Sequence, residues 1–290
     1  MTSAGSSFSR RAFLRLSAAF PFAGGAALLQ AKEPQIIIPS YNTLTDEEEI
    51  AFGRKVAAEF DAKLPLLGNR FLDEYVNGMV AKLGRASQRP NMDYQAKVIN
   101  TADVNAFSIL GGHMYVYRGL LQFIQSEAEL AAVLGHEIGH VAGHHSANKI
   151  MFNVRAKQLY EVVKKNVLLQ NQVIRQVIEK LGGPLAILAM MKYQRDYEFQ
   201  ADMLGFYEVL RCNWNPDGFT EFFDKIAKMT GDSDALRKLL SDHPEPVDRA
   251  ARIRQEMAAI RLPARMTETS LSFKTMKLGL SALPPLPAKK

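Results

Sequence analysis

His136-Glu137-Ile138-Gly139-His140 is an HExxH pattern that lies in a segment with a strong tendency to form a helix. Ser126-Glu127-Ala128-Glu129 has the form of a capping box, and the apolar run after it predicts a helix that continues into the pattern. Residues four apart share one face of a helix, with Cβ atoms about 6 Å apart. Two imidazoles at this spacing predict a site that binds one metal ion.

Zinc suits this pair of histidines, because it binds neutral imidazole nitrogens at about 2.0–2.1 Å and keeps one position open for water in catalytic sites. Glu137 would lie beside that water and act as general base. The alternative is a chance match on a solvated helix, which the small number of histidines in the chain disfavours. We therefore predict His136 and His140 as zinc ligands.

A third ligand is needed, and the sequence limits the choice. A metzincin-type histidine would occupy the position of Ser146. The segment 197–205 instead offers Glu198 and Asp202, again four residues apart. We predict that Glu198 completes the site and that Asp202 accepts a hydrogen bond from the far nitrogen of a ligand histidine, which fixes its tautomer. The alternative is that both carboxylates lie on a solvent-exposed helix face and bind no metal.

Together these motifs resemble the gluzincin zinc metalloproteases, the family of HtpX, the BepA-type periplasmic proteases and the CAAX prenyl proteases. Besides HExxH and ExxxADxxG, three segments carry the resemblance: 105–107 (NAF), 111–121 (GGHMYVYRGLL), and His243-Pro244 followed by Arg249. The resemblance spans roughly residues 40–262. It implies one Zn²⁺ per chain, held by His136, His140 and Glu198, with Glu137 as base and proton carrier.

The resemblance also implies roles for residues outside the ligand set. His243 would lie near the open coordination position, where it either stabilises the oxyanion or binds the metal and holds the enzyme latent. Arg249 would orient His243 or the substrate carbonyl. The alternatives are a loop histidine ordered by Pro244 and an arginine on a solvated helix. His144 and His145 are interpreted as structural or surface residues.

The fold class predicted is α+β: a mostly helical, zincin-type domain with a small antiparallel sheet or hairpin beside the HExxH helix. The segments of Phe107 and Tyr115 are expected to pair across Gly111-Gly112. An edge strand there would align an extended substrate by strand addition, through Asn105, Ala106 and Phe107. Capping and periodicity predict the other elements, which are helices over about 45–61, 69–84, 159–181 and 247–260, a helix opened by 215–216, and a strand over 94–100.

The N-terminus resembles a twin-arginine export signal. Residues 9–15 read SRRAFLR, and the apolar segment after them is interrupted by Pro21, Gly24 and Gly25. Cleavage is predicted after Ala31, with Ala27 as the alternative, which implies a periplasmic protein. The competing interpretation is that the two arginines lie in a disordered N-terminal segment and have no role in export.

Residues 32–262 are predicted to form one zinc metalloprotease domain, and residues 263–290, with their proline-rich end, a loosely ordered tail. A chain of 290 residues with 47% hydrophobic content suffices for one core. Removing residues 1–31 takes away three arginines and no acid, which lowers the net charge from +6 to +3. This charge gives no reason to expect nucleic-acid binding.

The role of residues 150–184 stays open between core packing, a lid over the site and a membrane-surface helix. No stretch after the signal reaches the roughly 18 apolar residues of a spanning helix. The function predicted is a zinc endopeptidase that cleaves misfolded or misassembled cell-envelope proteins, with envelope or outer-membrane proteins as partners and peripheral membrane contact. The alternative is a chaperone-like assembly or quality-control factor with a latent zinc site.

Overall fold

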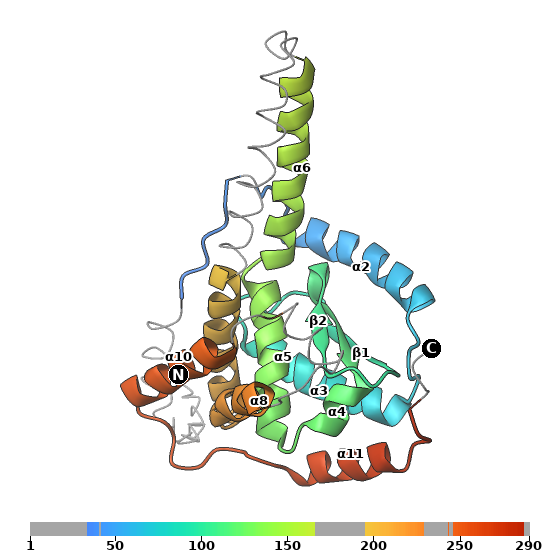
Figure 1. The fold of residues 1–290 in the computed structure, drawn as a ribbon, viewed down its shortest axis with the longest axis vertical. Helices are drawn as coiled ribbons and strands as arrows, with labels where there is room; N and C mark the ends of the chain where they lie inside the picture. Colours follow the sequence, from blue (N-terminus) through green and yellow to red (C-terminus); the bar gives the residue numbers. More distant parts are fainter. Residues whose placement is uncertain (1–33, 41, 166–194, 229–242, 244–245, 287–290) are drawn as a thin grey trace, which may run out of the picture. The chain divides into compact units, whose positions relative to one another are not determined.

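The computed structural model describes residues 34–40, 42–165, 195–228, 243 and 246–286 (Figure 1). The chain divides into two compact units, Met1–Lys32 and Glu33–Lys290, and all described residues belong to the second. The predicted export signal and residues 166–184 lie outside the described residues, so the proposals for them stay predictions. No helix in the described ranges is both long and apolar enough to cross a bilayer.

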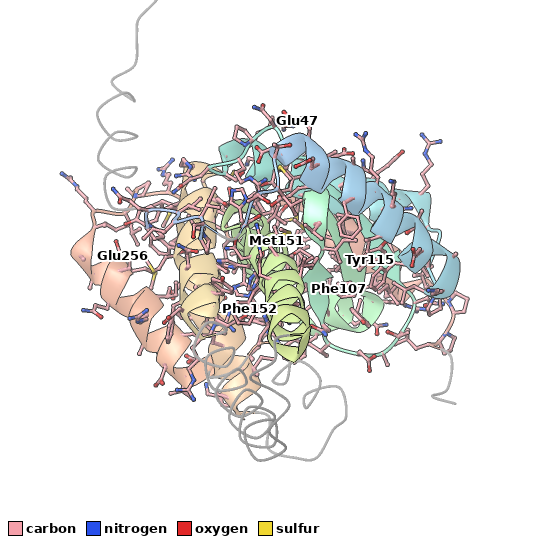
Figure 2. All side chains as sticks on the ribbon, turned by 90° about the horizontal axis from the view of Figure 1, so that it is seen from above. Glu47, Phe107, Tyr115, Met151, Phe152 and Glu256 are labelled. Carbon is pink, nitrogen blue, oxygen red and sulfur yellow. The ribbon has the colours of Figure 1, made fainter. Side chains whose placement is uncertain are left out.

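A three-stranded sheet has the strand order β1-β3-β2. β2 (Ala106–Ser108) pairs antiparallel with β3 (His113–Tyr117), and Phe107 lies opposite Tyr115, which confirms the predicted hairpin. The two rings stack, with centroids 5.1 Å apart (Figure 2). The turn, η1 (Leu110–Gly112), needs both of its glycines, because their φ angles are +81° and +97°.

The prediction of a small antiparallel sheet holds for β2 and β3 but not for β1 (Gln95–Ile99), which pairs parallel with β3. The chain reverses twice between these strands, so β1 and β3 run in the same direction. β3, which is almost fully buried, takes the central position between β1 and β2. The sheet is therefore mixed, and β2 lies at one edge.

Two helices precede and support the sheet. α2 (Asp46–Lys63) begins with a complete capping box at Thr45, as predicted. α3 (Arg70–Ala86) is capped by Asn69 and buries a stripe at helical spacing that packs on β1 and α5. This stripe consists of Leu72, Val76, Met79, Val80 and Leu83.

The HExxH pattern lies on α5 (Glu127–Ala142), which follows the short α4 (Arg118–Phe123) and precedes α6 (His145–Lys165). Ser126 caps α5 by accepting from the Glu129 N–H, while the Glu129 carboxylate accepts from the N–H of Gln125. Figure 1 shows α5 between the sheet and two further helices, α8 (Asp217–Lys228) and the helix over residues 195–211. A helix enclosed in this way must be apolar on nearly all sides, and nearly every residue of α5 is buried.

Small residues let α5 and the 195–211 helix approach closely. A Cβ built on Gly205 would lie 2.5 Å from the carbonyl carbon of Gly135, and one on Gly139 would lie 2.4 Å from the carbonyl oxygen of Ala201. Real Cβ atoms do not approach backbone atoms at such distances, so the crossing requires glycine at both positions. This crossing brings Glu198 and Asp202 next to the histidines of α5.

Replacing Gly205 by alanine is expected to lower the free energy of unfolding by about 1–3 kcal/mol, because the added methyl group forces two packed backbones apart. Urea unfolding measures the change. Gly78→Ala is the matched control, since Gly78 lies in α3 with no atom within 4 Å of a built Cβ. The control is expected to be neutral or stabilising by up to about 1 kcal/mol. Equal stability of the two variants would contradict the close crossing.

The C-terminal segment forms two more helices. α10 (Pro246–Ala259) confirms the helix expected over about 247–260, and it packs on α8. The prediction of a loosely ordered tail is wrong for residues 263–286, because α11 (Leu271–Ser281) is capped by Ser270 and buries Phe273, Met276 and Leu280. The folded part of the chain therefore includes α11.

Candidate metal centre and cleft

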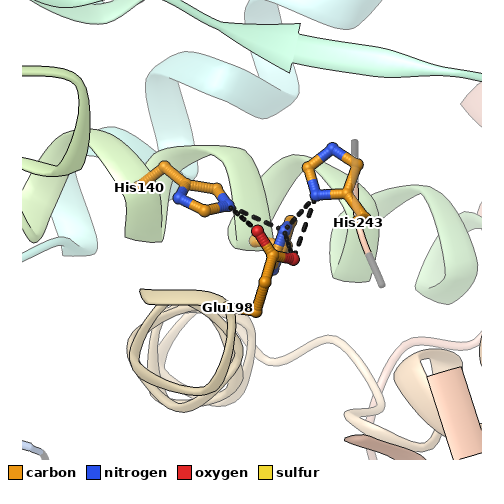
Figure 3. Close-up of side chains that lie close together, drawn as sticks. His140, Glu198 and His243 are labelled. Carbon is orange, nitrogen blue, oxygen red and sulfur yellow. Dashed lines mark hydrogen bonds and ion pairs between the residues drawn. The ribbon is translucent and has the colours of Figure 1, made fainter. Parts of the chain in front are cut away.

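Four side chains from three parts of the chain converge on one point, and Figure 3 labels three of them, His140, Glu198 and His243. His136 and His140 come from α5, Glu198 from the 195–211 helix, and His243 from the segment before α10. One possible ligand atom from each of them lies within 4.8 Å of all the others. The three predicted zinc ligands are thus brought together, and His243 joins them.

The spacing of these atoms fits a tetrahedral ion. Bonds of about 2.0–2.1 Å in tetrahedral geometry separate the donor atoms by about 3.3 Å. Nε2 of His136 lies 3.0 Å from Nε2 of His140 and 3.4 Å from Oε2 of Glu198, and Nε2 of His140 lies 3.2 Å from the other carboxylate oxygen, Oε1 of Glu198. Nδ1 of His243 lies 3.1 Å both from Nε2 of His136 and from Oε2 of Glu198. Three imidazoles and one carboxylate are also donors that zinc accepts.

Asp202 lies behind His136, as predicted, with Oδ1 2.9 Å from Nδ1 of the imidazole. A hydrogen bond donated by Nδ1 leaves Nε2 unprotonated and directed at the cluster. Arg249 donates to both oxygens of Asp202 at 2.7 Å, and its Nη1 lies 3.0 Å from Oε2 of Glu198. The guanidinium also lies 4.5 Å from the ring centre of Phe223. Arg249 therefore balances the buried charge of two carboxylates.

The electrostatics of the cluster favour a positive charge at its centre. Burial alone would raise the pKa of Glu198, but the imidazoles of His140 and His136 hold it far below its usual range. Burial and Arg249 act to lower the pKa of His136, yet Glu198 and Asp202 raise it to about 9. Carboxylates on both sides of this imidazole thus attract a cation to it, whether a proton or a metal ion.

His145 is a partner of the cluster that the sequence did not reveal. Its Nδ1 lies 2.8 Å from Nδ1 of His140, and its Nε2 lies 2.8 Å from the side-chain oxygen of Gln200. Burial lowers the pKa of both His140 and His145, so both are neutral at pH 7. His145 then donates to Gln200 and accepts from His140, which directs Nε2 of His140 at Glu198. The interpretation of His145 as a structural or surface residue does not include this contact with a predicted ligand.

Glu137 is buried next to the cluster, and its carboxylate lies between Ser108 and His243. One oxygen accepts from the hydroxyl of Ser108 at 2.9 Å, and the other lies 3.5 Å from Nε2 of His243. Ser108 belongs to β2 and was not among the residues that the sequence singled out. His144, by contrast, pairs with Glu49 of α2 at 3.0 Å, away from the cluster.

Two hollows flank Glu137. A largely apolar pocket, open to solvent, includes Asn105 and Ala106 in its wall. A more polar groove, also open to solvent, includes Phe107 and Ser108. The three residues predicted to contact substrate therefore line the cleft, and β2 spans both of its halves.

Comparison with known proteins identifies a family. The model of peptidase family M48 matches residues 70–257. The beta-barrel assembly-enhancing protease of Yersinia pestis is 26% identical over 269 residues, which cover 90% of this chain and 55% of the relative. The metalloprotease YcaL of Escherichia coli is 28% identical, over 75% of this chain and 83% of the relative.

A mitochondrial relative is also similar. The metalloendopeptidase OMA1 of Arabidopsis thaliana is 30% identical over 58% of this chain and 33% of its own length. The chain spans about half the length of the beta-barrel assembly-enhancing proteases that it matches. The matched region contains the α5 histidines, Glu198, His243 and Arg249.

Proposed function

The chain belongs to peptidase family M48, a metalloprotease family, and from this premise we propose that it is a zinc-dependent endopeptidase with one Zn²⁺ per chain. The observation that carries the proposal is the convergence of His136, His140 and Glu198 beside the buried carboxylate of Glu137. Zinc bound there would polarise the scissile carbonyl and lower the pKa of a coordinated water toward about 7.

The residues around the cluster supply the remaining chemistry. Glu137 accepts a proton from the attacking water and passes it to the leaving amine. The Ser108 hydroxyl donates to one oxygen of Glu137, and the other oxygen, 3.5 Å from Nε2 of His243, is the one proposed to carry the proton. Asp202 and His145 hold the two α5 imidazoles in the tautomer that binds metal. Arg249 stabilises the carboxylates of Asp202 and Glu198 through its ion pairs with them.

Cleavage of casein or of an unfolded protein, with and without a chelator, tests the proposal. We expect cleavage that a chelator abolishes and that added zinc restores. A zinc-loaded protein without any cleavage would favour the alternative, a chaperone-like factor whose site is latent. The position of His243, 3.1 Å from atoms of two predicted ligands, is the observation that supports this alternative.

Latency and catalysis predict opposite results for His243→Ala. If His243 occupies the water position, removing it is expected to raise basal cleavage. If it steadies the oxyanion, kcat is expected to fall about 10²–10³-fold with zinc content intact. We expect the increase, since Nδ1 of His243 lies as close to the cluster as the ligand atoms do. Steady-state kinetics and metal analysis of the purified variant measure both quantities, and an unchanged enzyme would contradict both roles.

Cell-envelope proteins are the proposed substrates and partners, because two relatives are named for assembly of β-barrels. Location in the periplasm, with peripheral membrane contact, fits this class of substrate and the SRRAFLR segment. Nucleic acid is not a proposed partner.

Export by the twin-arginine route predicts that changing both Arg10 and Arg11 to lysine leaves a full-length precursor in the cytoplasm, because the paired guanidiniums are the recognised feature of such signals. Cell fractionation with detection of the precursor measures this. Changing Arg15 alone to lysine is the control, and we expect it to be exported. Normal processing of the double variant would indicate the general secretory route.

A further inference from the structure

Resting on the proposed zinc site, we infer that Gln200 is a positioning residue for the metal. Held by the backbone of Gln35, it acts through His145 and decides which ring nitrogen of His140 carries the proton. Zinc binds an imidazole only through a nitrogen without a proton, so this choice decides whether His140 can act as a ligand. The inference extends the site by one further side chain and by the segment that precedes α2.

Two neighbours of His140 compete for its proton. Nε2, the nitrogen that faces the cluster, lies 3.2 Å from Oε1 of Glu198, and a carboxylate at this distance attracts a proton to Nε2. Nδ1, on the other side of the ring, lies 2.8 Å from Nδ1 of His145. A proton on Nε2 would have to leave before a metal could bind there. His140 is therefore ready for the metal when its Nδ1 donates to His145.

His145 accepts at Nδ1 only when its own proton is on Nε2, because a neutral imidazole has one donor nitrogen and one acceptor nitrogen. Nε2 of His145 lies 2.8 Å from the side-chain oxygen of Gln200, and this oxygen can only accept. The ring also has a defined place. It stacks on Tyr197 with centroids 4.2 Å apart, and a Cβ built on Gly143 would lie 2.4 Å from its Nε2. The proton of His145 therefore follows the atom that Gln200 presents to it.

The orientation of the Gln200 amide is set by the backbone before α2. The amide nitrogen donates to the carbonyl oxygen of Gln35 at 3.3 Å. A carbonyl oxygen has no proton to donate, so the amide turns its nitrogen toward Gln35 and its oxygen toward His145. The reverse orientation would bring two oxygens together at Gln35. The hydrogen bonds thus run in one direction, from His140 through His145 and Gln200 to Gln35.

Three substitutions at Gln200 separate accepting from donating, since a carboxylate only accepts, an ammonium only donates, and a thioether does neither well. Gln200 is half-exposed, so the fold is expected to tolerate all three. We expect Gln200→Met to lower zinc affinity at least about tenfold, the usual effect of losing a group that orients a ligand. Gln200→Lys is expected to lower it at least as much, and Gln200→Glu to restore it toward the wild-type value. Competition with a chromogenic chelator measures the affinity.

NMR of the imidazole nitrogens in the metal-free protein locates the protons directly, because ring nitrogens with and without a proton differ widely in chemical shift. In the wild type we expect the proton of His140 on Nδ1 and that of His145 on Nε2. In Gln200→Met and Gln200→Lys the proton of His140 is expected on Nε2, where Glu198 attracts it. A purely structural role of Gln200 would not move these protons.

Gln88→Met is the matched control. The Gln88 amide also donates to the segment before α2, at the carbonyl of Pro34 3.4 Å away, but Gln88 belongs neither to the cluster nor to the hollows beside it. We expect this variant to keep the zinc affinity and the proton positions of the wild type.

Unchanged proton positions in Gln200→Met would overturn the inference, whether or not zinc affinity falls. So would a Gln200→Lys protein that binds zinc as tightly as Gln200→Glu does. Either result leaves the proposed zinc site intact. A wild-type chain that binds no zinc would overturn the proposed function, and the proton positions in the metal-free protein would still decide the inference.

Discussion

Changing Glu137 to glutamine is expected to lower the rate of peptide cleavage at least about 100-fold while leaving zinc at one ion per chain. Glutamine keeps the size of the side chain and its ability to accept from Ser108, but it does not take up a proton at neutral pH. Glu137 is outside the group of four converging ligand atoms, so metal binding does not depend on it. The expected loss is therefore a loss of proton transfer alone.

Single-turnover cleavage, metal analysis and thermal unfolding of the purified variant separate these effects. Glu47→Gln is the matched control, since Glu47 is exposed on α2 and the change is chemically identical. The control is expected to cleave at the wild-type rate. Wild-type cleavage by Glu137→Gln would mean that another group acts as the base.

The second large effect is expected for the metal. Glu198 is the one anionic member of the four-residue cluster. Glu198→Ala removes this charge and also leaves Nη1 of the buried Arg249 without its carboxylate at 3.0 Å. Arg249 stays paired with Asp202, so the main effect is that the metal loses its one anionic ligand. Zinc affinity is therefore expected to fall by at least about 100-fold, which corresponds to about 2.8 kcal/mol.

Competition with a chromogenic chelator measures the affinity. Asp196→Ala is the control, because Asp196 is exposed on the same helix and its loss leaves the cluster intact. If Glu198→Ala holds zinc as tightly as the wild type, the third ligand is another residue. His243 is then the residue to change next, since it also contributes an atom to the cluster.

Local patterns predicted most of the fold. The capping residues Thr45, Asn69 and Ser126 mark the observed helix starts, because capping depends on neighbours a few residues away. The parallel pairing of β1 could not be predicted in the same way, since it depends on which strand becomes central. α11 was not predicted, because the proline-rich residues after it indicated a loosely ordered tail. It nevertheless buries Phe273, Met276 and Leu280, which lie at helical spacing.

The candidate site was likewise predicted only in part from local patterns. The two i,i+4 pairs, His136 with His140 and Glu198 with Asp202, revealed its main components, because each pair lies on one helix. His145 and Ser108 were missed, since their roles depend on Gln200 and Glu137, which are distant in sequence. Contacts of this kind follow from tertiary packing and leave no local pattern.

The ion pairs of Arg249 have a consequence for the order in which the chain is synthesised. Asp202 and Glu198 leave the ribosome before Arg249 does, so until α10 is made only the imidazoles of His136 and His140 can balance these two carboxylates. Burying them without the guanidinium removes the strongest of their ion pairs, so the packing of α5 against the 195–211 helix is expected to be less stable until α10 arrives. A chain truncated before α10 is therefore expected to unfold more readily around the cluster than the full chain does.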